Sequence, residues 1–425
     1  MTMIKFQEEI QPLLQEEFSK RRDNKSNQME GKTRISVGYP VYGVEEVMAA
    51  LETLLDLRLS QGEKTEAFER QFAAYVGMPS SIAVNSGSSA NLLALNALID
   101  CGYLKRGDEV IVPAATFATV SSPIYQLGLV PVYLDVDESS WCLDPLEIEA
   151  ALTKKTKLIM PVHNLGFPAN MERIMKIANR HSLLVLEDCC ESHGAEWQGK
   201  KVGSFGLVST LSFFVAHNIT TGEGGMIFTR DPQLEAALRS LREFGRLRGH
   251  PTRFYSDEIL KDYDHRYVFT RLGFNVRMTE MVAALGLVQL NKLESLNKRR
   301  REIAGRLLRE IEPFGESIRS LTPTPGTLAA YYGFPLIVKE NSSFTRRELC
   351  EHLEAHGIET RAMMGGCLPD QPGFRNLSHR IVGKLERSRR LRDHAFFIGC
   401  HSGIQEEGVS HITKTLSQFL EKHSR

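Results

Sequence analysis

The strongest constraint on the fold is a regular alternation of short apolar runs with helical stretches, which begins near residue 80. The runs are apolar along most of their length, so each predicts a strand that is buried on both faces of a sheet. Strands that alternate with helices are typical of an α/β fold with a mostly parallel sheet. The predicted strands are 81–84, 109–113, 131–136, 157–162, 183–188, 210–214 and 225–229.

The pattern changes after these strands. A long helix is predicted over 279–311, and it is followed by a strand over 331–338 and helices over 345–357 and 411–423. A chain of 425 residues is too long for one ordinary core. We therefore predict three parts: an N-terminal helix and linker (1–34), a large α/β domain (35–311) and a smaller C-terminal α+β domain (312–425).

The composition argues against several classes of protein. Lys+Arg and Asp+Glu both number 52, so the balanced chain is not expected to bind nucleic acid. The cationic run 297–306 falls in a helical pattern and is interpreted as a solvated helix face. No apolar run reaches the ~18 residues of a membrane span, and the N-terminus lacks the apolar core of a signal peptide. The seven scattered cysteines predict reduced thiols and a cytoplasmic protein.

Two polar features fall directly after predicted strands, where α/β sheets bind ligands. In "NSGSSAN" (85–91), a Gly-Ser-Ser turn before a helix could offer backbone N–H groups and hydroxyls to an anion, or could simply be a capped helix start. The strand 183–188 ends in Glu187 and Asp188. A carboxylate buried there needs a partner, which could be a protonated heterocyclic nitrogen, a helix start or an internal cation.

The third feature is "SFFVAHNITTGEGG" (212–225), at the end of another strand. Ser212 could hold a phosphate oxygen, and the glycine-rich turn could approach a cofactor closely. His217 alone could be either a hydrogen-bonded loop histidine or a catalyst.

The three features in this chain order resemble those of a fold-type I pyridoxal phosphate enzyme. More narrowly, the chain resembles the DegT/DnrJ/EryC1/StrS sugar aminotransferase family from about residue 40 to its end. The motifs that carry the resemblance are "NSGSSANLLAL", "EDCCESHGA", "SFF…NITTGEGGM" and "GFNVRMTEMVAALGLVQL".

The resemblance implies a role for individual residues. Gly87, Ser88 and Ser89 match the phosphate-binding turn, and Ser212 matches a second phosphate contact. Phe117 matches the aromatic side chain that stacks on the pyridine ring.

Two further matches concern the ring nitrogen and the assembly. Asp188 matches the residue that keeps the ring nitrogen protonated, so that the ring can act as an electron sink. Asn275 matches a residue given to the neighbouring subunit's cofactor, which implies a homodimer.

The chain departs from the aminotransferases of the family at His217. They carry a lysine there, which holds the cofactor covalently. The 3-dehydratase branch of deoxysugar pathways has histidine instead and binds pyridoxamine phosphate without a covalent link. Glu191, three residues after Asp188, adds to this resemblance, since the aminotransferases tend to have Gln or His there, and we expect it to contact the cofactor.

One group of these 3-dehydratases also holds an iron–sulfur cluster, which needs four thiolates. Cys190 matches one of its cysteines, but the other three positions are Arg248, His250 and Glu258. No cysteine occurs between 190 and 350. We therefore predict no cluster and no other metal, and interpret Cys190 as an ordinary buried thiol.

The resemblance thus predicts a cluster-free 3-dehydratase of a nucleotide-linked 4-keto-6-deoxyhexose. In this prediction His217 is the base, pyridoxal or pyridoxamine phosphate is bound non-covalently, and glutamate is the amino donor. Two alternatives remain: an aminotransferase-like enzyme for another keto or amino compound, and a non-catalytic relative that binds a nucleotide sugar.

Overall fold

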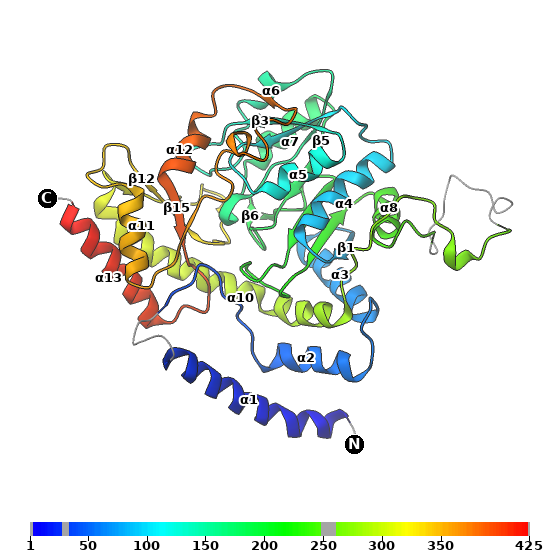
Figure 1. Cartoon of the computed structure of the whole chain (residues 1–425), viewed down its shortest axis with the longest axis horizontal. Coiled ribbons are helices and arrows are strands. Elements are labelled where there is room, and N and C mark those ends of the chain that lie inside the picture. The colour runs from blue at the N-terminus through cyan, green and yellow to red at the C-terminus, as the bar shows by residue number, and fades with distance from the viewer. Residues whose placement is uncertain (1–2, 28–33, 248–260, 424–425) are drawn as a thin grey trace.

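The computed structural model describes residues 3–27, 34–247 and 261–423. Two sheets lie side by side and are connected by one long helix, α10 (Glu280–Ile311), which runs beneath both (Figure 1). The larger sheet is mostly parallel and the smaller one belongs to the C-terminal part. The predicted α/β architecture is confirmed.

The large sheet has eight strands in the order β1-β9-β8-β5-β4-β2-β3-β14. β9 pairs antiparallel with both of its neighbours, and the other pairs are parallel. Only β14, the short strand from the C-terminal part, was not predicted. The strands are β1 (Ser80–Val84), β2 (Glu109–Pro113), β3 (Val130–Leu134), β4 (Thr156–Ile159), β5 (Leu184–Asp188), β8 (Val208–Ser212), β9 (Gly225–Thr229) and β14 (Arg380–Ile381).

This topology decides where a site can form. Because β1 and β8 are each antiparallel to the strand between them, they are parallel to one another. The carboxyl ends of β1, β2, β5 and β8 therefore lie at one edge of the sheet, where α/β proteins bind ligands.

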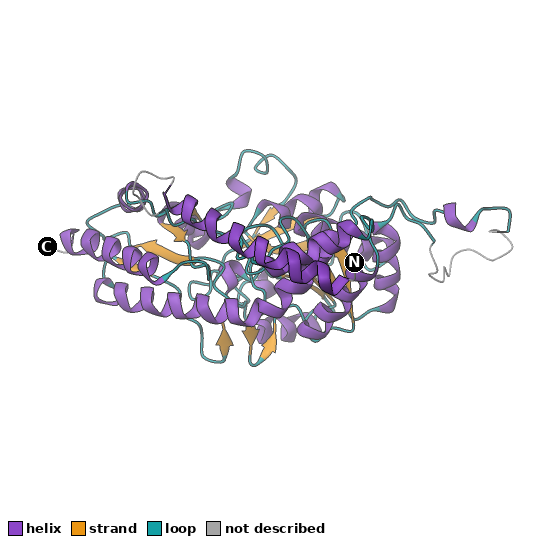
Figure 2. Cartoon of the chain, turned by 90° about the horizontal axis from the view of Figure 1, so that it is seen from below, coloured by secondary structure: helices purple, strands orange, loops and turns teal. Residues whose placement is uncertain are grey.

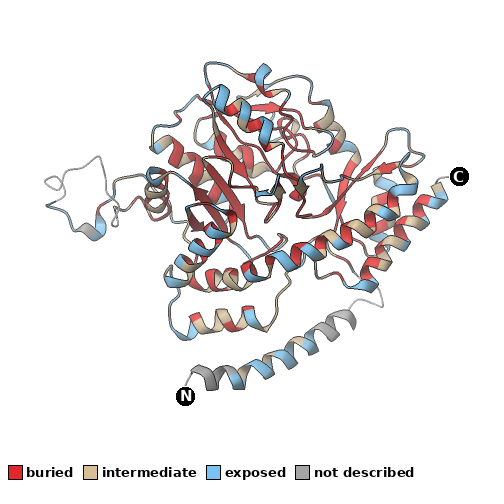
Figure 3. Cartoon of the chain, turned by 180° about the vertical axis from the view of Figure 1, so that it is seen from behind, coloured by how far each residue is buried: buried red, intermediate tan, exposed pale blue. Residues whose placement is uncertain are grey.

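Helices cover the large sheet, whose strands are almost entirely buried (Figure 3). The helix α1 extends along the outside and its described side chains are mostly exposed. The helices of this part are α1 (Met3–Asn27), α2 (Val44–Leu55), α3 (Glu63–Val76), α4 (Gly87–Asp100), α5 (Ala118–Gln126), α6 (Ile148–Ala151), α7 (Met171–Arg180) and α8 (Pro232–Arg242).

The smaller sheet is antiparallel, in the order β10-β12-β15-β13, and packs against three helices and α10. A separate small sheet joins β11 to β6 and β7. The elements are β6 (Glu196–Trp197), β7 (Lys200–Lys201), β10 (Ile318–Arg319), β11 (Thr327–Leu328), β12 (Phe334–Val338), β13 (Thr360–Ala362), β15 (Ala395–Ile398), α11 (Arg346–Ala355), α12 (Glu386–His394) and α13 (Glu406–His423).

Short segments connect the two parts of the chain. Ile35 forms a bridge with Ile358 and belongs to the core of the smaller sheet, while β14 joins the large sheet. The domain boundaries at 35 and 312 stay a prediction.

The helix α10 is uninterrupted over its 32 residues, and it lies along the length of the molecule when seen from below (Figure 2). At its start, the buried Glu280 carboxylate accepts hydrogen bonds from the backbone N–H groups of Gly62, Lys64 and Thr65, around the N-terminus of α3. An anion stabilises a helix N-terminus in this position. This contact fixes α10 to the large domain.

The sequence interpretation of the cationic run 297–306 as a solvated helix face is only partly correct. Arg300 is only 2% exposed and donates hydrogen bonds to both parts of the chain, at Tyr331 and at His217. In the part of the chain that the structure describes, no helix is both long and apolar enough to cross a membrane.

Candidate cofactor site

The first turn of α4 lies against the end of β8. A Cβ atom on Gly87 would fall 2.4 Å from the Ser212 Cβ and 3.2 Å from the Cys190 Sγ. Only glycine permits this approach, because those distances leave no room for a side chain. The contact brings the helix start that follows β1 together with the end of β8 and the residue Cys190, which follows β5.

The serines of the turn differ in their surroundings. Ser86 caps α4, since its Oγ accepts a hydrogen bond from the Ser89 N–H at 3.1 Å and lies 3.0 Å from the Ser89 Oγ. Ser88 is exposed. The N–H groups of Gly87 and Ser88 lie at the first two positions of the helix, where α4 offers no acceptor for them. The turn thus offers an anion two backbone donors and the exposed hydroxyl of Ser88.

Asp188 ends β5 and is held from two sides. Its Oδ2 accepts from the Asn91 Nδ2 at 2.8 Å, and its Oδ1 accepts from the Cys190 N–H at 3.0 Å. Thr210 donates in turn to the Asn91 Oδ1 at 2.7 Å. The carboxyl group is therefore fixed in orientation, and its oxygens can accept a further hydrogen bond from a protonated nitrogen.

Glu187 points to the opposite face of β5, where its carboxylate is held by backbone N–H groups and lies next to a histidine. Its carboxylate accepts from the N–H groups of Gly203, Phe205 and Gly206 and lies 3.3 Å from the His163 Nε2. Burial would raise the pKa of Glu187, but these hydrogen bonds outweigh burial and hold the pKa below its ordinary value. Of the two carboxylates at this strand end, only Asp188 faces α4.

Glu191 is buried behind the loop that follows β4. Its Oε2 accepts from the Leu165 N–H at 2.6 Å. Burial raises the pKa of Glu191 to about 8, and the nearby Asp188 charge acts in the same direction. The Glu191 carboxyl is therefore largely protonated at neutral pH and can donate a hydrogen bond.

Phe117 precedes α5, at the end of the loop after β2, and is 52% exposed. The neighbouring Thr116 is buried, and its carbonyl accepts from the Gly365 N–H at 3.1 Å. An exposed phenyl ring on a fixed backbone offers a flat apolar surface at the ligand edge of the sheet.

His217 lies in the turn after β8, among aromatic rings. Its ring centroid is 5.2 Å from that of Tyr332, 5.7 Å from that of His193 and 6.3 Å from that of Phe214. The His217 Nδ1 has no hydrogen-bond partner among the described residues. Burial holds the pKa of His217 well below its ordinary value, and His193 and Arg300 act in the same direction. The imidazole is therefore neutral at physiological pH and can accept a proton.

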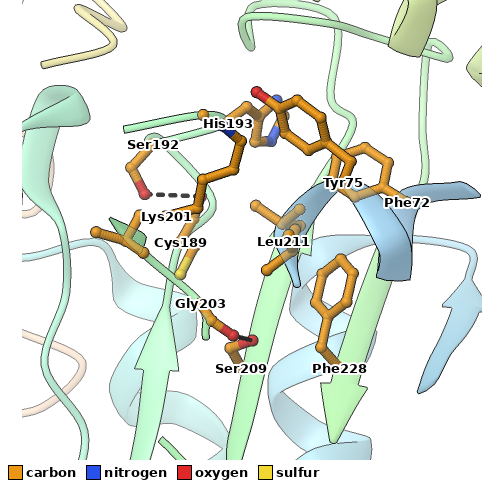
Figure 4. A pocket seen from close by; sticks show the side chains of 13 residues that line it. Phe72, Tyr75, Cys189, Ser192, His193, Lys201, Gly203, Ser209, Leu211 and Phe228 are labelled. Atoms are coloured by element: carbon orange, nitrogen blue, oxygen red, sulfur yellow. Dashed lines mark hydrogen bonds between the residues drawn. The ribbon is translucent and has the colours of Figure 1, made fainter. Parts of the chain in front are cut away.

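His193, whose ring is next to that of His217, lines a small pocket with Tyr75, Cys189 and Leu211 (Figure 4). Both of its ring nitrogens are buried, and the ring lies beside the backbone of Ser212. Burial lowers the pKa of His193 to about 3, so this ring is also neutral.

Asn275 is exposed and lies apart from these residues, in the segment beside the end of β1. Its Oδ1 accepts hydrogen bonds from the Arg277 Nε and Nη2 at 3.2 and 3.1 Å. The backbone carbonyl of Val276 accepts from the Asn85 N–H at 2.9 Å. The structure thus ties this segment to the start of the α4 turn without bringing the Asn275 side chain into contact with the other predicted site residues.

Sequence reasoning missed four residues at the site. Asn91 and His193 lay inside quoted motifs but received no role, although Asn91 is one turn along α4 from the cap. Tyr332 and Arg300 come from distant parts of the chain, and no local signal points to them.

Of the four positions that correspond to the cluster cysteines, the structure describes only that of Cys190. Cys190 is half-buried rather than buried, and its Sγ faces Gly87. Burial, with the charge of Asp188, raises the pKa of its thiol well above the ordinary value, so the thiol stays protonated. Arg248, His250 and Glu258 lie outside the described residues.

These features together fit pyridoxal phosphate. The close Gly87 contact leaves backbone donors for a phosphate, Asp188 offers a fixed acceptor for a ring nitrogen, and Phe117 offers an apolar face for the ring. The Cys190 thiol beside Gly87 stays protonated, and the Nδ1 atom of the neutral His217 ring has no hydrogen-bond partner among the described residues.

A model of the DegT/DnrJ/EryC1/StrS aminotransferase family matches residues 41–417. The chain belongs to this family. It is 36% identical over 394 residues to lipopolysaccharide biosynthesis protein RfbH of Salmonella typhimurium, with 89% of this chain and 90% of that protein covered. It is 34% identical over 408 residues to dTDP-4-dehydro-2,6-dideoxy-D-glucose 3-dehydratase of Saccharopolyspora spinosa, with 93% and 88% covered.

Among solved structures, the chain is similar to E. coli GDP-4-keto-6-deoxy-D-mannose-3-dehydratase with bound hydrated PLP. The TM-score is 0.85 at 31% sequence identity, and the match covers 91% of this chain and 100% of that one. Other structures of a GDP-4-keto-6-deoxymannose-3-dehydratase hold GDP-perosamine or a trapped PLP–glutamate geminal diamine. The chain is also similar to the aminotransferase from Psychrobacter cryohalolentis, with a TM-score of 0.82 at 28% sequence identity and 91% of this chain and 99% of that one covered.

This DegT/DnrJ/EryC1/StrS protein therefore has the fold-type I architecture and is a PLP-dependent enzyme that modifies sugars. The match confirms the family and the cofactor that the sequence motifs predicted. It leaves dehydration and amino transfer as the two chemistries to be distinguished.

The Gly87 contact yields a test of the cofactor site. Gly87→Ala would force α4 away from β8, and overpacking of this kind costs about 1–3 kcal/mol. If the strain falls on phosphate binding, we expect the Kd for PLP to rise roughly 5- to 150-fold in an absorbance titration. Gly373→Ala is the matched control, since a Cβ there meets nothing within 4 Å. Equal PLP affinity of the two variants would contradict the assignment.

Proposed function

We propose that this protein is a 3-dehydratase of a nucleotide-linked 4-keto-6-deoxyhexose, with His217 as the base. The observation that carries the proposal is the identity and state of residue 217. It is a neutral histidine at the place where the resemblance expects a cofactor-binding lysine, and no lysine occurs in 212–225. The two 3-dehydratases among the relatives described above support it.

In this proposal the predicted residues divide the task of holding the cofactor. Gly87, Ser88, Ser89 and Ser212 bind the phosphate, and Phe117 covers the ring. The Asp188 carboxylate, fixed by Asn91, accepts from the ring nitrogen. The protonated Glu191 carboxyl donates a hydrogen bond from the side of Leu165.

The bound pyridoxamine phosphate supplies an amine for the sugar ketone and a ring that takes up electrons. His217 takes up a proton at its free ring nitrogen, and this proton transfer allows the C3 hydroxyl to leave as water. No side-chain amine is present at this position to retain the cofactor, so binding is non-covalent.

With glutamate as the amino donor, the atoms and electrons of the overall reaction balance. The substrate and glutamate give the 3-deoxy-4-keto sugar, 2-oxoglutarate and ammonia, so glutamate supplies the two electrons that replace the C3 hydroxyl by hydrogen. A related dehydratase structure with a PLP–glutamate adduct supports this choice of donor.

The His217 assignment is tested by two substitutions. His217→Asn should retain the fold and the cofactor but lose about 10²–10⁴-fold in turnover, as removal of a general base does. His217→Lys should restore a covalent cofactor and produce some 4-amino sugar. Product analysis by mass spectrometry on GDP-, CDP-, UDP- and dTDP-linked 4-keto-6-deoxy sugars measures both.

Wild-type turnover in His217→Asn would show that the base lies elsewhere. An amino sugar made by the wild-type enzyme would favour the aminotransferase alternative, and absence of a cofactor band from the purified protein would favour a non-catalytic binder.

We also propose that the protein acts as a homodimer in which Asn275 serves the partner's cofactor. The exposed position of Asn275, away from its own site, supports this. Asn275→Ala should weaken PLP binding without changing the fold, as measured by absorbance titration. A monomer that light scattering finds fully loaded with PLP would contradict the proposal.

A further inference from the structure

Arg300 is an unusual buried cation. It lies on α10 at 2% exposure, and its hydrogen bonds go to backbone carbonyls, with no ion pair to any carboxylate among the side chains that the structure describes. A buried charge without a counter-ion costs several kcal/mol unless other polar groups compensate it. Its position therefore requires specific partners.

The partners of Arg300 are backbone carbonyls from two segments at the site. Its Nη1 donates to the carbonyl oxygens of Tyr331 and Tyr332, each at 3.0 Å, and its Nη2 donates to the carbonyl oxygen of His217 at 3.5 Å. The planar guanidinium can span several acceptors at once, which an ammonium group cannot do in the same geometry. Arg300 therefore links the His217 turn to the segment that carries the Tyr332 ring.

A second side chain of α10 strengthens this connection one turn earlier. Asn297 accepts from the Asn218 Nδ2 at 2.7 Å and donates to the carbonyl oxygen of His193 at 2.7 Å. Asn218 also donates to the Ala330 carbonyl oxygen at 2.8 Å. One face of α10 thus holds the backbone on both sides of the His217 ring.

The charges around His217 are few. His193 and Tyr332 face its ring and are both neutral, since burial lowers the pKa of His193 to about 3 and raises that of Tyr332. Glu191, near Tyr332, has a pKa raised to about 8 by burial. Arg361, also near Tyr332, is paired with Glu359. Arg300 is the remaining cation, among the described residues, that acts on His217.

We propose that Arg300 is a positioning residue for His217: its buried guanidinium fixes the His217 turn against Tyr332 and places a positive charge beside this turn. This inference rests on the proposed role of His217 as base. A nearby positive charge disfavours an imidazolium, so Arg300 acts on the pKa of His217 in the same direction as burial. A neutral imidazole stays ready to accept a proton, and the imidazolium formed by proton transfer gives the proton up easily.

The experiment uses holoenzyme with histidine labelled with ¹³C at Cε1, and the His217 signal is assigned by its loss in His217→Asn. In the wild type this signal should not titrate between about pH 5 and 9. In Arg300→Met both the charge and the hydrogen bonds to the three carbonyls are lost, so the His217 turn should be released towards solvent and the signal should titrate with a midpoint above about pH 5. Turnover of this variant should be lost as the pH falls through that midpoint, because a protonated imidazole cannot accept a proton.

Two further variants separate charge from position. Arg300→Lys keeps the cation but not the planar fork, so His217 should stay neutral while kcat falls more than KM rises. Arg299→Met is the matched control: Arg299 is the adjacent arginine of α10, it pairs with Glu406, and its loss should change neither the His217 signal nor kcat.

If Arg300→Met is folded and leaves the His217 signal pH-independent, or if the His217 signal titrates in Arg300→Lys as it does in Arg300→Met, the proposal is wrong. Should Arg300→Met fail to fold, Arg300→Lys decides by itself: a wild-type kcat, or a His217 signal that titrates between about pH 5 and 9, would overturn the proposal. The signal is independent of turnover, so failure of the proposed function, seen as an active His217→Asn, is distinguished from failure of the Arg300 role.

Discussion

The contact between the first turn of α4 and the end of β8 is the constraint on which the site depends. A glycine at position 87 lets a helix N-terminus approach a strand end so closely that a Cβ would overlap Ser212. Parallel strand order brings Asp188 to the same edge, and Asn91 of α4 reaches back to fix its carboxylate. Helix, strand end and carboxylate thus form one unit, and a displacement of α4 would disturb all three.

The second determinant of the site is α10, which connects the large and small sheets. Glu280 fixes its start to the N-terminus of α3, and Arg300 and Asn297 fix the site loops farther along. Buried charges are costly. Backbone N–H groups and the Thr65 hydroxyl hold Glu280, and backbone carbonyls hold Arg300, whose Nε has no partner among the described residues. The position of His217 relative to Tyr332 therefore depends on a helix whose sequence shows no sign of catalytic use.

Much of this architecture could be predicted from the sequence because it follows from local patterns. Continuous apolar runs gave the strands of the large sheet, and the parallel order then placed the strand-end residues at one edge. The strand pattern alone did not separate Glu187 from Asp188, although side chains alternate along a strand and the two must face opposite sides; only the family resemblance gave Asp188 its role. The short strand β14 carries no pattern of its own, and its pairing with β3 depends on the tertiary fold.

The burial of Arg300 shows a different limit. A cationic run in a helix is most simply explained as a solvated face, and that interpretation holds for its exposed neighbours but fails where α10 passes between the two sheets. The partners of Arg300 are backbone carbonyls about 31 and 83 residues away along the chain, so no side-chain pattern could indicate them. Tertiary packing alone decides which arginine of the run is buried.

The central claim is that a neutral histidine replaces the lysine that would bind the cofactor covalently. Borohydride reduction of the PLP-loaded protein, followed by peptide mass spectrometry, tests it most directly, because reduction makes any lysine-bound cofactor permanent. The account predicts that no lysine peptide carries a pyridoxyl group and that the cofactor is released on denaturation. A stoichiometric pyridoxyl adduct on any lysine would contradict it.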